Sequence, residues 1–243
     1  MPSILLINPN TSEATTRMMA DIVRAHLHVD VVVRGVTART GVPMIVNHAE
    51  LVDSAHQVRT CWAEAGSGWD GVIVACFGDP GVAWLRQQTD APVTGIGEAA
   101  MRDAADAGRR FGVATTTPGL AADIAACALR LGLAESYSGV RATAQEPHQL
   151  VAQPAELQAA LAQAVAACID QDGAQAVVIG GGPLGQAALA LAPLFSQALV
   201  SPLVSAAHWM QQQLAGAQLH RETINGPSRI PLAASLTPKG SRP

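Results

Sequence analysis

A short apolar run that ends in a cysteine constrains the fold of this chain more than any other stretch. Residues 72–75 are Val-Ile-Val-Ala, Cys76 follows directly, and Phe-Gly-Asp-Pro-Gly at 77–81 ends the run. A continuous apolar run bounded by turn residues is typical of a parallel strand that is covered on both faces. Because Pro80 and Gly81 can begin a helix, we expect a thiol at the carboxyl edge of a sheet, where open α/β proteins bind ligands.

The expected surroundings of Cys76 favour an acidic thiol. We predict a helix of about eight residues after the loop, with Val82, Trp84 and Leu85 on it. Its N-terminus and the exposed backbone N–H groups would hold an anion and lower the thiol pKa from about 8.5 by a unit or more. The alternative, a buried structural thiol, does not account for the loop that follows.

Composition limits the protein classes to consider. Hydrophobic residues make up 49% of the 243 residues and charged residues 14%, so a large core is available. A net charge of −4 without a basic stripe argues against a nucleic-acid partner. The N-terminus lacks a secretory pattern, and no apolar run approaches the roughly 18 residues of a membrane span. The cysteines at 61, 76, 127 and 168 lack paired spacing, so we expect no disulfide or zinc site and a cytoplasmic location.

Strand and helix patterns alternate along the chain, which predicts an α/β fold. Strands are expected at 4–7, 29–36, 72–75, 92–96, 110–114, 138–143, 176–179 and 199–204. Helices are expected over 48–64, 98–107, from Thr117 as N-cap to about 131, from 154, and over 208–214. Cys61, Cys127 and Cys168 fall on or beside apolar helix faces, where packing is the expected role. Residues 225–243 lack periodicity, and we expect a mobile tail.

The chain contains a weak internal repeat. Residues 4–12 match 111–118, residues 71–80 match 176–183, and residues 92–94 match 202–204. The repeat predicts two similar α/β halves with parallel sheets, at about 1–108 (with a contribution from 205–224) and 109–215. Loops 8–12, 76–81, 115–118 and 180–185 would then surround one active-site cleft between the halves.

Several motifs together resemble the aspartate/glutamate/hydantoin racemase family, and its hydantoin and allantoin racemase branch most. The motifs are Ile-Asn-Pro-Asn-Thr-Ser at 7–12, Ala-Cys-Phe-Gly-Asp-Pro-Gly at 75–81, Gly-Ile-Gly-Glu-Ala-Ala-Met at 95–101 and Thr-Thr-Thr at 115–117. The resemblance implies two flavodoxin-like halves, a homo-oligomer, and neither a cofactor nor a metal. It further implies a small anionic or carbonyl substrate, such as a hydantoin, a ureide or an amino-acid derivative. It also implies two catalytic cysteines, one in each half, which move a proton at the carbon α to a carbonyl. Cys76 matches the first of them.

The chain departs from this pattern at the second cysteine. Gly181, within Gly-Gly-Gly-Pro at 180–183, holds that position. Four outcomes stay open: a racemase with water or His208 as second acid, a single-thiol decarboxylase or tautomerising isomerase, covalent attack by Cys76 as in maleate isomerases, and a non-catalytic relative.

The groups expected around the substrate come from the loops of both halves. They are the side chains of Asn8, Asn10, Thr11, Thr116 and Thr117 and the backbone at Phe77 and Gly182. The alternative for the first loop is that helix capping uses its polar groups, with Thr11 or Ser12 as N-cap. Asp79 and Glu98 are expected to act as loop and helix-cap groups rather than as an acid–base pair.

Overall fold

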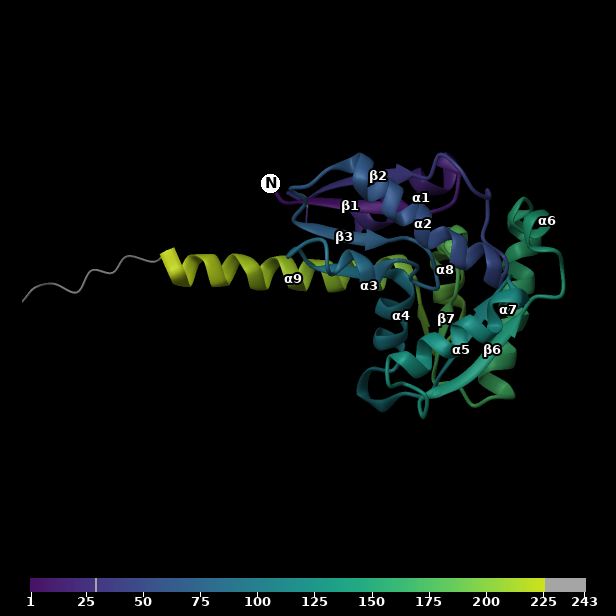
Figure 1. Cartoon of the computed structure of the whole chain (residues 1–243). Helices are drawn as coiled ribbons and strands as arrows, with labels where there is room; N and C mark the ends of the chain where they lie inside the picture. Colours follow the sequence, from purple (N-terminus) through teal and green to yellow (C-terminus); the bar gives the residue numbers. More distant parts are fainter. Residues whose placement is uncertain (29, 226–243) are drawn as a thin grey trace, which may run out of the picture.

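Two parallel four-stranded sheets form the centre of the protein (Figure 1). The computed structural model describes residues 1–28 and 30–225. The first sheet has the order β2-β1-β3-β4, and the second has the matching order β6-β5-β7-β8. The strands are β1 (Ser3–Asn8), β2 (Val32–Thr37), β3 (Gly71–Val74), β4 (Val93–Gly95), β5 (Phe111–Thr115), β6 (Tyr137–Ala142), β7 (Ala176–Ile179) and β8 (Ala198–Val200). The predicted fold class, two similar α/β halves with parallel sheets, is therefore confirmed.

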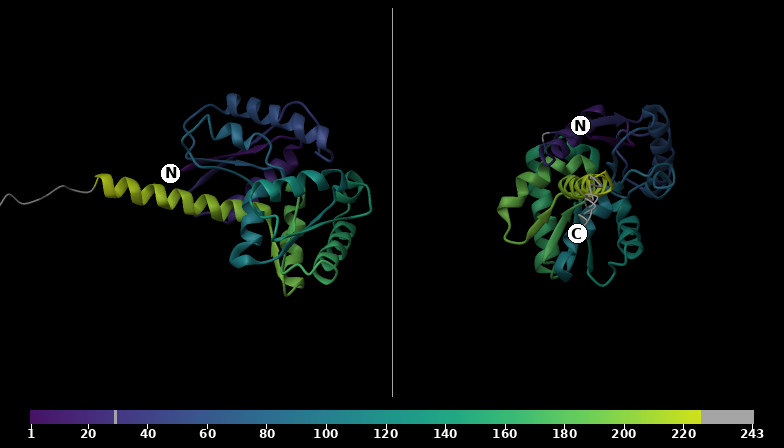
Figure 2. Two further views of the ribbon diagram at one scale, coloured as in Figure 1. Left: turned by 60° about the horizontal axis from the view of Figure 1, so that its bottom comes forward. Right: turned by 90° about the vertical axis from the view of Figure 1, so that its left-hand side faces the viewer.

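Helices connect the strands and cover the sheets (Figures 1 and 2). The α-helices are α1 (Glu13–Ala25), α2 (His48–Ala65), α3 (Val82–Leu85), α4 (Ile96–Ala104), α5 (Ala121–Arg130), α6 (Pro147–Val151), α7 (Pro154–Asp170), α8 (Gly185–Leu191) and α9 (Pro202–Asn225). The 3₁₀ turns are η1 (Asp106–Gly108), η2 (Pro118–Leu120), η3 (Gly182–Leu184) and η4 (Ala192–Leu194).

Helix α9 links the two halves. It begins after the last strand of the second sheet but packs against α4, α1, β3 and β4 of the first half. Its C-terminal part extends beyond the body of the protein in Figure 1 and in the left view of Figure 2. The start of α9 therefore fastens the second half to the first.

The apolar core extends across both halves. Met19 and Ile96 of the first half belong to the same buried cluster as Phe111, Val178 and Leu203. Each buried side chain of this size contributes about 1.5–3 kcal/mol. This shared core holds the loops at the ends of the two sheets in a fixed relation, as a site between them requires.

The two sheets also share one pairing register. Ala75 donates to the carbonyl of Ile7 at 2.8 Å, and Gly180 donates to that of Ala114 at 2.8 Å. The pairs that correspond are Ile4–Gly71 with Phe111–Ala176, and Ile7–Val74 with Ala114–Ile179. Cys76 and Gly181 therefore occupy equivalent positions, each one residue beyond equivalent backbone bonds.

The strand predicted over 199–204 is wrong at its C-terminal end. β8 ends at Val200, and Pro202 begins α9, a position that suits proline because it lacks an N–H. The repeat that matches 92–94 with 202–204 is wrong for the same reason, because β4 corresponds to β8.

Other boundaries also shift, and the shorter α3 is the change that affects the site. α3 has only four residues instead of about eight. β2 begins at Val32, whereas the predicted strand begins at residue 29, a residue outside the described ranges. α4 covers Ile96–Ala104 instead of 98–107. The helix predicted over 208–214 is the middle of α9.

Some sequence predictions concern matters that the structure does not test. The tail from 226 onward lies outside the described residues. The domain boundaries and the homo-oligomer stay predictions. Within the described ranges, no helix has the length and apolar character needed to cross a bilayer.

Candidate active site

One cavity of about 40 Å³ is lined by loops of both halves. Its walls combine the loops after β1, β3, β5 and β7 with part of the segment between β2 and α2. The lining residues are Asn10, Met44, Ile45, Ala75, Cys76, Phe77, Thr116, Thr117, Leu120, Gly180, Gly181, Gly182, Pro183 and Leu184. The cavity thus brings together most of the residues that the sequence nominated, including Cys76 and Gly181.

Cys76 is a mostly buried thiol at the end of β3, with 9% of the residue exposed. Burial raises the pKa of the Cys76 thiol well above its ordinary value, and the negative charge of Asp79 raises it further. The predicted decrease in thiol pKa is therefore wrong. Burial is the main reason, and nothing opposes it: α3 has a single turn and little dipole, and among the described residues no cation lines the cavity.

The loop that carries Gly181 lies against the loop that carries Cys76. A Cβ on Gly180 would come within 2.8 Å of the Phe77 ring, and one on Gly182 within 3.1 Å of the Ala75 carbonyl oxygen. Glycine at these two positions therefore allows the loops to approach closely.

The polar loop after β1 contributes Asn10 to the cavity but not Asn8 or Thr11. The Asn8 side chain is fully buried, and its amide donates to Asn10 Oδ1 at 2.8 Å and to Thr16 Oγ1 at 2.9 Å. The Thr11 N–H donates to the Val42 carbonyl at 3.0 Å. We therefore revise Asn8 and Thr11 from substrate contacts to groups that fix the loop. Ser12 caps α1, as one of the two candidates predicted: its Oγ accepts the Thr15 N–H.

The threonine loop after β5 is fastened by a residue that sequence analysis did not select. Thr115 is fully buried, and its hydroxyl donates to the Gly180 carbonyl at 2.7 Å and lies 3.0 Å from Thr117 Oγ1. Thr116 and Thr117 line the cavity. Thr117 occupies the predicted N-cap position with Pro118 after it, but the segment begins as a 3₁₀ turn and the Thr117 side chain makes no cap hydrogen bond.

The cavity also has an apolar wall that the sequence patterns did not predict. Met44 and Ile45 come from the irregular segment between β2 and α2, and Leu120 and Leu184 come from 3₁₀ turns. Leu120 belongs to the helical pattern predicted after Thr117, whereas the other three lie in segments without a helix or strand period, so the sequence offered no signal for a shared wall.

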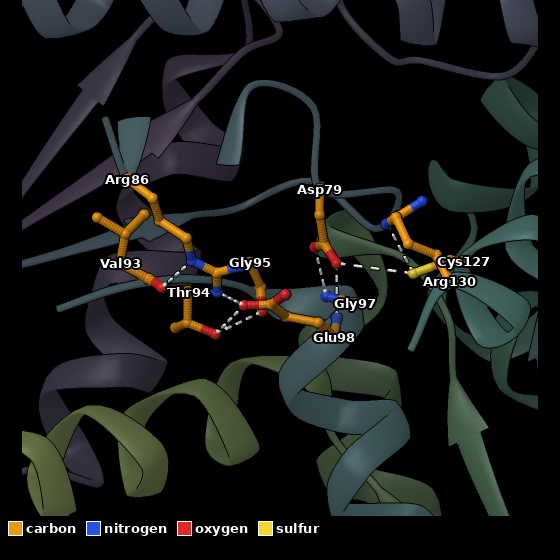
Figure 3. A network of polar contacts seen from close by, with 9 residues as sticks. All are labelled: Asp79, Arg86, Val93, Thr94, Gly95, Gly97, Glu98, Cys127 and Arg130. Atoms are coloured by element: carbon orange, nitrogen blue, oxygen red, sulfur yellow. Dashed lines mark hydrogen bonds and ion pairs between the residues drawn. The ribbon is translucent and has the colours of Figure 1, made fainter. Parts of the chain in front are cut away.

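Polar groups that do not line the cavity form a network around the start of α4 (Figure 3). Asp79 accepts the N–H groups of Gly97 and Glu98 in the first turn of α4, so this loop carboxylate satisfies helix N–H groups. Glu98 forms an ion pair with Arg86, which also donates to the Val93 carbonyl. Neither carboxylate lines the cavity.

Two further predictions can be judged from the structure. His208 is exposed on α9 and lines a different hollow with Arg102 and Asp103, so the hypothesis that it supplies the second acid is wrong. Cys61, Cys127 and Cys168 are buried, as predicted. Burial raises the pKa of Cys127 to about 12, which suits a packing role.

Comparison with known proteins identifies the family. The family model for Asp/Glu/Hydantoin racemase matches residues 4–210. A hydantoin racemase of Rhizobium meliloti is 30% identical over 185 residues, which cover 73% of this chain and 74% of that protein. An allantoin racemase from Klebsiella pneumoniae superposes with a TM-score of 0.83 at 28% identity, covering 89% of each chain. Arylmalonate decarboxylase, at 18% identity, TM-score 0.60 and coverage of 88% of this chain and 93% of that one, shares the fold. The chain therefore belongs to the aspartate/glutamate/hydantoin racemase family.

Proposed function

We propose that this protein is a cofactor-independent racemase or isomerase in which the Cys76 thiol moves a proton at the carbon α to a carbonyl. The observation that carries the proposal is the cavity lining. Among the described residues, Cys76 is the only lining residue whose side chain is a titratable group. It follows a buried parallel strand at the sheet edge where ligands of this fold class bind.

The cavity favours a neutral substrate. Its polar side chains are Asn10, Thr116 and Thr117, and no charged side chain of the described residues lines it. A substrate carboxylate would lose water there without gaining a cationic partner, which is unfavourable. A hydantoin or related cyclic ureide instead offers carbonyl and N–H groups to amide and hydroxyl groups. We therefore propose this substrate class over free amino acids.

The proposed step moves one proton. The thiolate of Cys76 takes the α-hydrogen, so the C–H bond breaks, an S–H bond forms, and the electron pair becomes an enolate. Amide and hydroxyl donors near the developing oxyanion lower the barrier by about 3–4 kcal/mol for each well-placed donor. Because Gly181 supplies no acid, a water molecule must protonate the opposite face, and we expect racemisation to be slow.

The raised pKa of Cys76 supports a second candidate, a lyase. A protonated thiol is ready to donate. If carbon dioxide leaves first, the resulting enolate takes the S–H proton directly, and no thiolate is needed beforehand. The uncharged cavity argues against a malonate dianion, so we place this candidate second.

The decisive assay follows a 5-substituted hydantoin in deuterium oxide by NMR and polarimetry. We expect deuterium at the α-carbon, and Cys76→Ser should lower its rate of incorporation about 10²–10⁴-fold. Cys168→Ser is the matched control, because this thiol is fully buried in the second half and outside the cavity. Equal rates in the two variants would refute a role for Cys76. Carbon dioxide release from a 2-substituted malonate, without exchange into the hydantoin, would favour the lyase.

A further inference from the structure

Asp79 has an unusual backbone conformation at the end of the turn that carries the thiol. Its backbone is left-handed, with φ at 55°, a conformation that aspartate tolerates better than most residues. Its N–H donates to the carbonyl of Cys76 at 3.0 Å and closes the turn that carries the thiol. The thiol turn, residues 76–79, therefore ends in a buried carboxylate.

That carboxylate joins the thiol turn to α4. The Gly97 N–H donates to Oδ1 at 2.8 Å, and the Glu98 N–H donates to Oδ2 at 2.6 Å. Both N–H groups belong to the first turn of α4 and have no partner within the helix. Figure 3 shows Asp79 reaching from its loop to the start of α4, with Cys127 of α5 on its other side. The Cys127 thiol lies 3.9 Å from Oδ2.

The local sequence makes room for this carboxylate. A Cβ on Gly95 would lie 2.1 Å from Oδ1 of Asp79, and one on Gly97 would lie 2.9 Å from Oδ2. Neither glycine has a left-handed backbone. Their lack of a side chain therefore serves the approach of Asp79.

The second half has neither a thiol nor a carboxylate at the positions equivalent to Cys76 and Asp79. By the shared register, Gly181 stands for Cys76. Leu184 follows Gly181 at the spacing at which Asp79 follows Cys76. Ser201 and Leu203 take the places of Gly95 and Gly97. The carboxylate thus occurs only in the half that carries a thiol at this position, although both halves have the same strand order.

From this geometry we infer that Asp79 is a positioning residue for Cys76, which holds the thiol turn against the first turn of α4. The inference rests on Cys76 being the reacting thiol of the proposed function. The charged and titratable groups around the carboxylate are Cys76 on its own loop, Glu98 on α4, and Cys127 and Arg130 on α5. Because Asp79 is the negative group that acts on the thiol, its removal should change thiol reactivity as well as thiol position.

The test measures alkylation of Cys76 by iodoacetamide across a range of pH. It uses the full chain in a Cys61→Ser background, so that the tryptic peptide 60–86 contains a single thiol. Asp79→Asn keeps the size of the side chain and removes its charge. We expect alkylation at about pH 8 to become at least roughly threefold faster, because the neighbouring negative charge is lost. We also expect kcat for proton exchange to fall about tenfold or more, because the turn moves.

Glu98→Gln is the matched control. Glu98 also carries a buried carboxylate in the first turn of α4, but this carboxylate pairs with Arg86. Only the backbone N–H of Glu98 bonds Asp79, and the substitution keeps it. This change should lower the melting temperature while leaving the alkylation profile of Cys76 within about twofold of wild type. If Asp79→Asn also leaves the alkylation profile at the wild-type rates, the inference is overturned.

A second variant covers the case in which Asp79→Asn does not fold. Gly97→Ala places a Cβ against Oδ2 and pushes the carboxylate away without altering any charge. A changed alkylation rate of Cys76 would support the inference, and an unchanged rate would overturn it. Alkylation requires no substrate. A changed profile without detectable exchange in any variant would therefore refute the proposed function and leave the positioning role intact.

Discussion

Restoring a thiol at position 181 tests the proposed geometry most directly. The two sheets share one register, so Gly181→Cys places a thiol at the position equivalent to Cys76, on the same cavity. General acid catalysis by a well-placed group contributes about 10²–10⁴-fold. We therefore expect hydantoin racemisation to rise by about 10²-fold or more, because protonation of the second face no longer depends on water.

The structure also predicts that Gly181→Cys lowers the stability of the folded protein. Gly181 has φ at 158°, at the edge of the region that favours glycine, and a Cβ there would lie 3.1 Å from the Leu184 side chain. Backbone strain of this kind costs of order 1–3 kcal/mol. We expect a loss of stability of that size in urea denaturation, and the leucine end can move to accommodate the new side chain.

Gly181→Ser separates the two effects, because it imposes the same strain without a thiol. Circular dichroism of an optically pure 5-substituted hydantoin gives the racemisation rate for wild type and both variants. If Gly181→Cys gains no more than Gly181→Ser while both stay folded, the idea of two facing positions across one cavity is refuted.

Three further predictions concern charge and pH. For base catalysis by a thiol of raised pKa, kcat/KM for exchange should increase about tenfold per pH unit between pH 7 and 9, whereas a pH-independent rate would indicate the thiol acting as an acid. Burial raises the pKa of Asp79 from 3.8 to about 7, so the folded state holds the extra proton. The titration of Asp79 therefore makes the free energy of unfolding decrease as the pH rises from 3.8 to about 7, by at most about 1.4 kcal/mol per pH unit. Urea denaturation should show a smaller decrease in Asp79→Asn. Finally, Arg86→Ala should lower the unfolding free energy by about 1–3 kcal/mol, because it leaves the Glu98 carboxylate buried without its cation, and a change below about 0.5 kcal/mol would contradict this.

The positions of Cys76 and Gly181 are predictable from the sequence because both depend on local patterns. Apolar runs of four residues mark β3 and β7, and a glycine- or proline-containing turn follows each. β8 was placed too far along because Leu203 and Val204 continue an apolar stretch across Pro202. A short apolar run does not distinguish a buried strand from the first turn of a buried helix.

The protonation state of the Cys76 thiol could not be predicted from the sequence because it depends on tertiary contacts. Sequence placed a helix N-terminus beside Cys76, but the length of α3 and the burial of the sulfur depend on how the second half packs over the loop. Asp79 lies close to the thiol in sequence, yet its partners at Gly97 and Glu98 are reached only when β4 and α4 fold against the loop. Local patterns therefore predicted where the sulfur is, but not whether it holds its proton.

The asymmetry between the halves bears on how the site works. A site with one thiol in each half would allow each thiol to serve as acid and as base. Here the first half retains the thiol and a carboxylate that secures its turn, and the second half has glycine and leucine at the equivalent positions. Since Asp79 raises the thiol pKa, this arrangement favours proton donation over proton removal in the free protein. Substrate that displaces water from the cavity makes the thiolate harder still to form. The rate of exchange should therefore be limited by removal of the α-proton, and a substrate with a more acidic α-carbon should react faster.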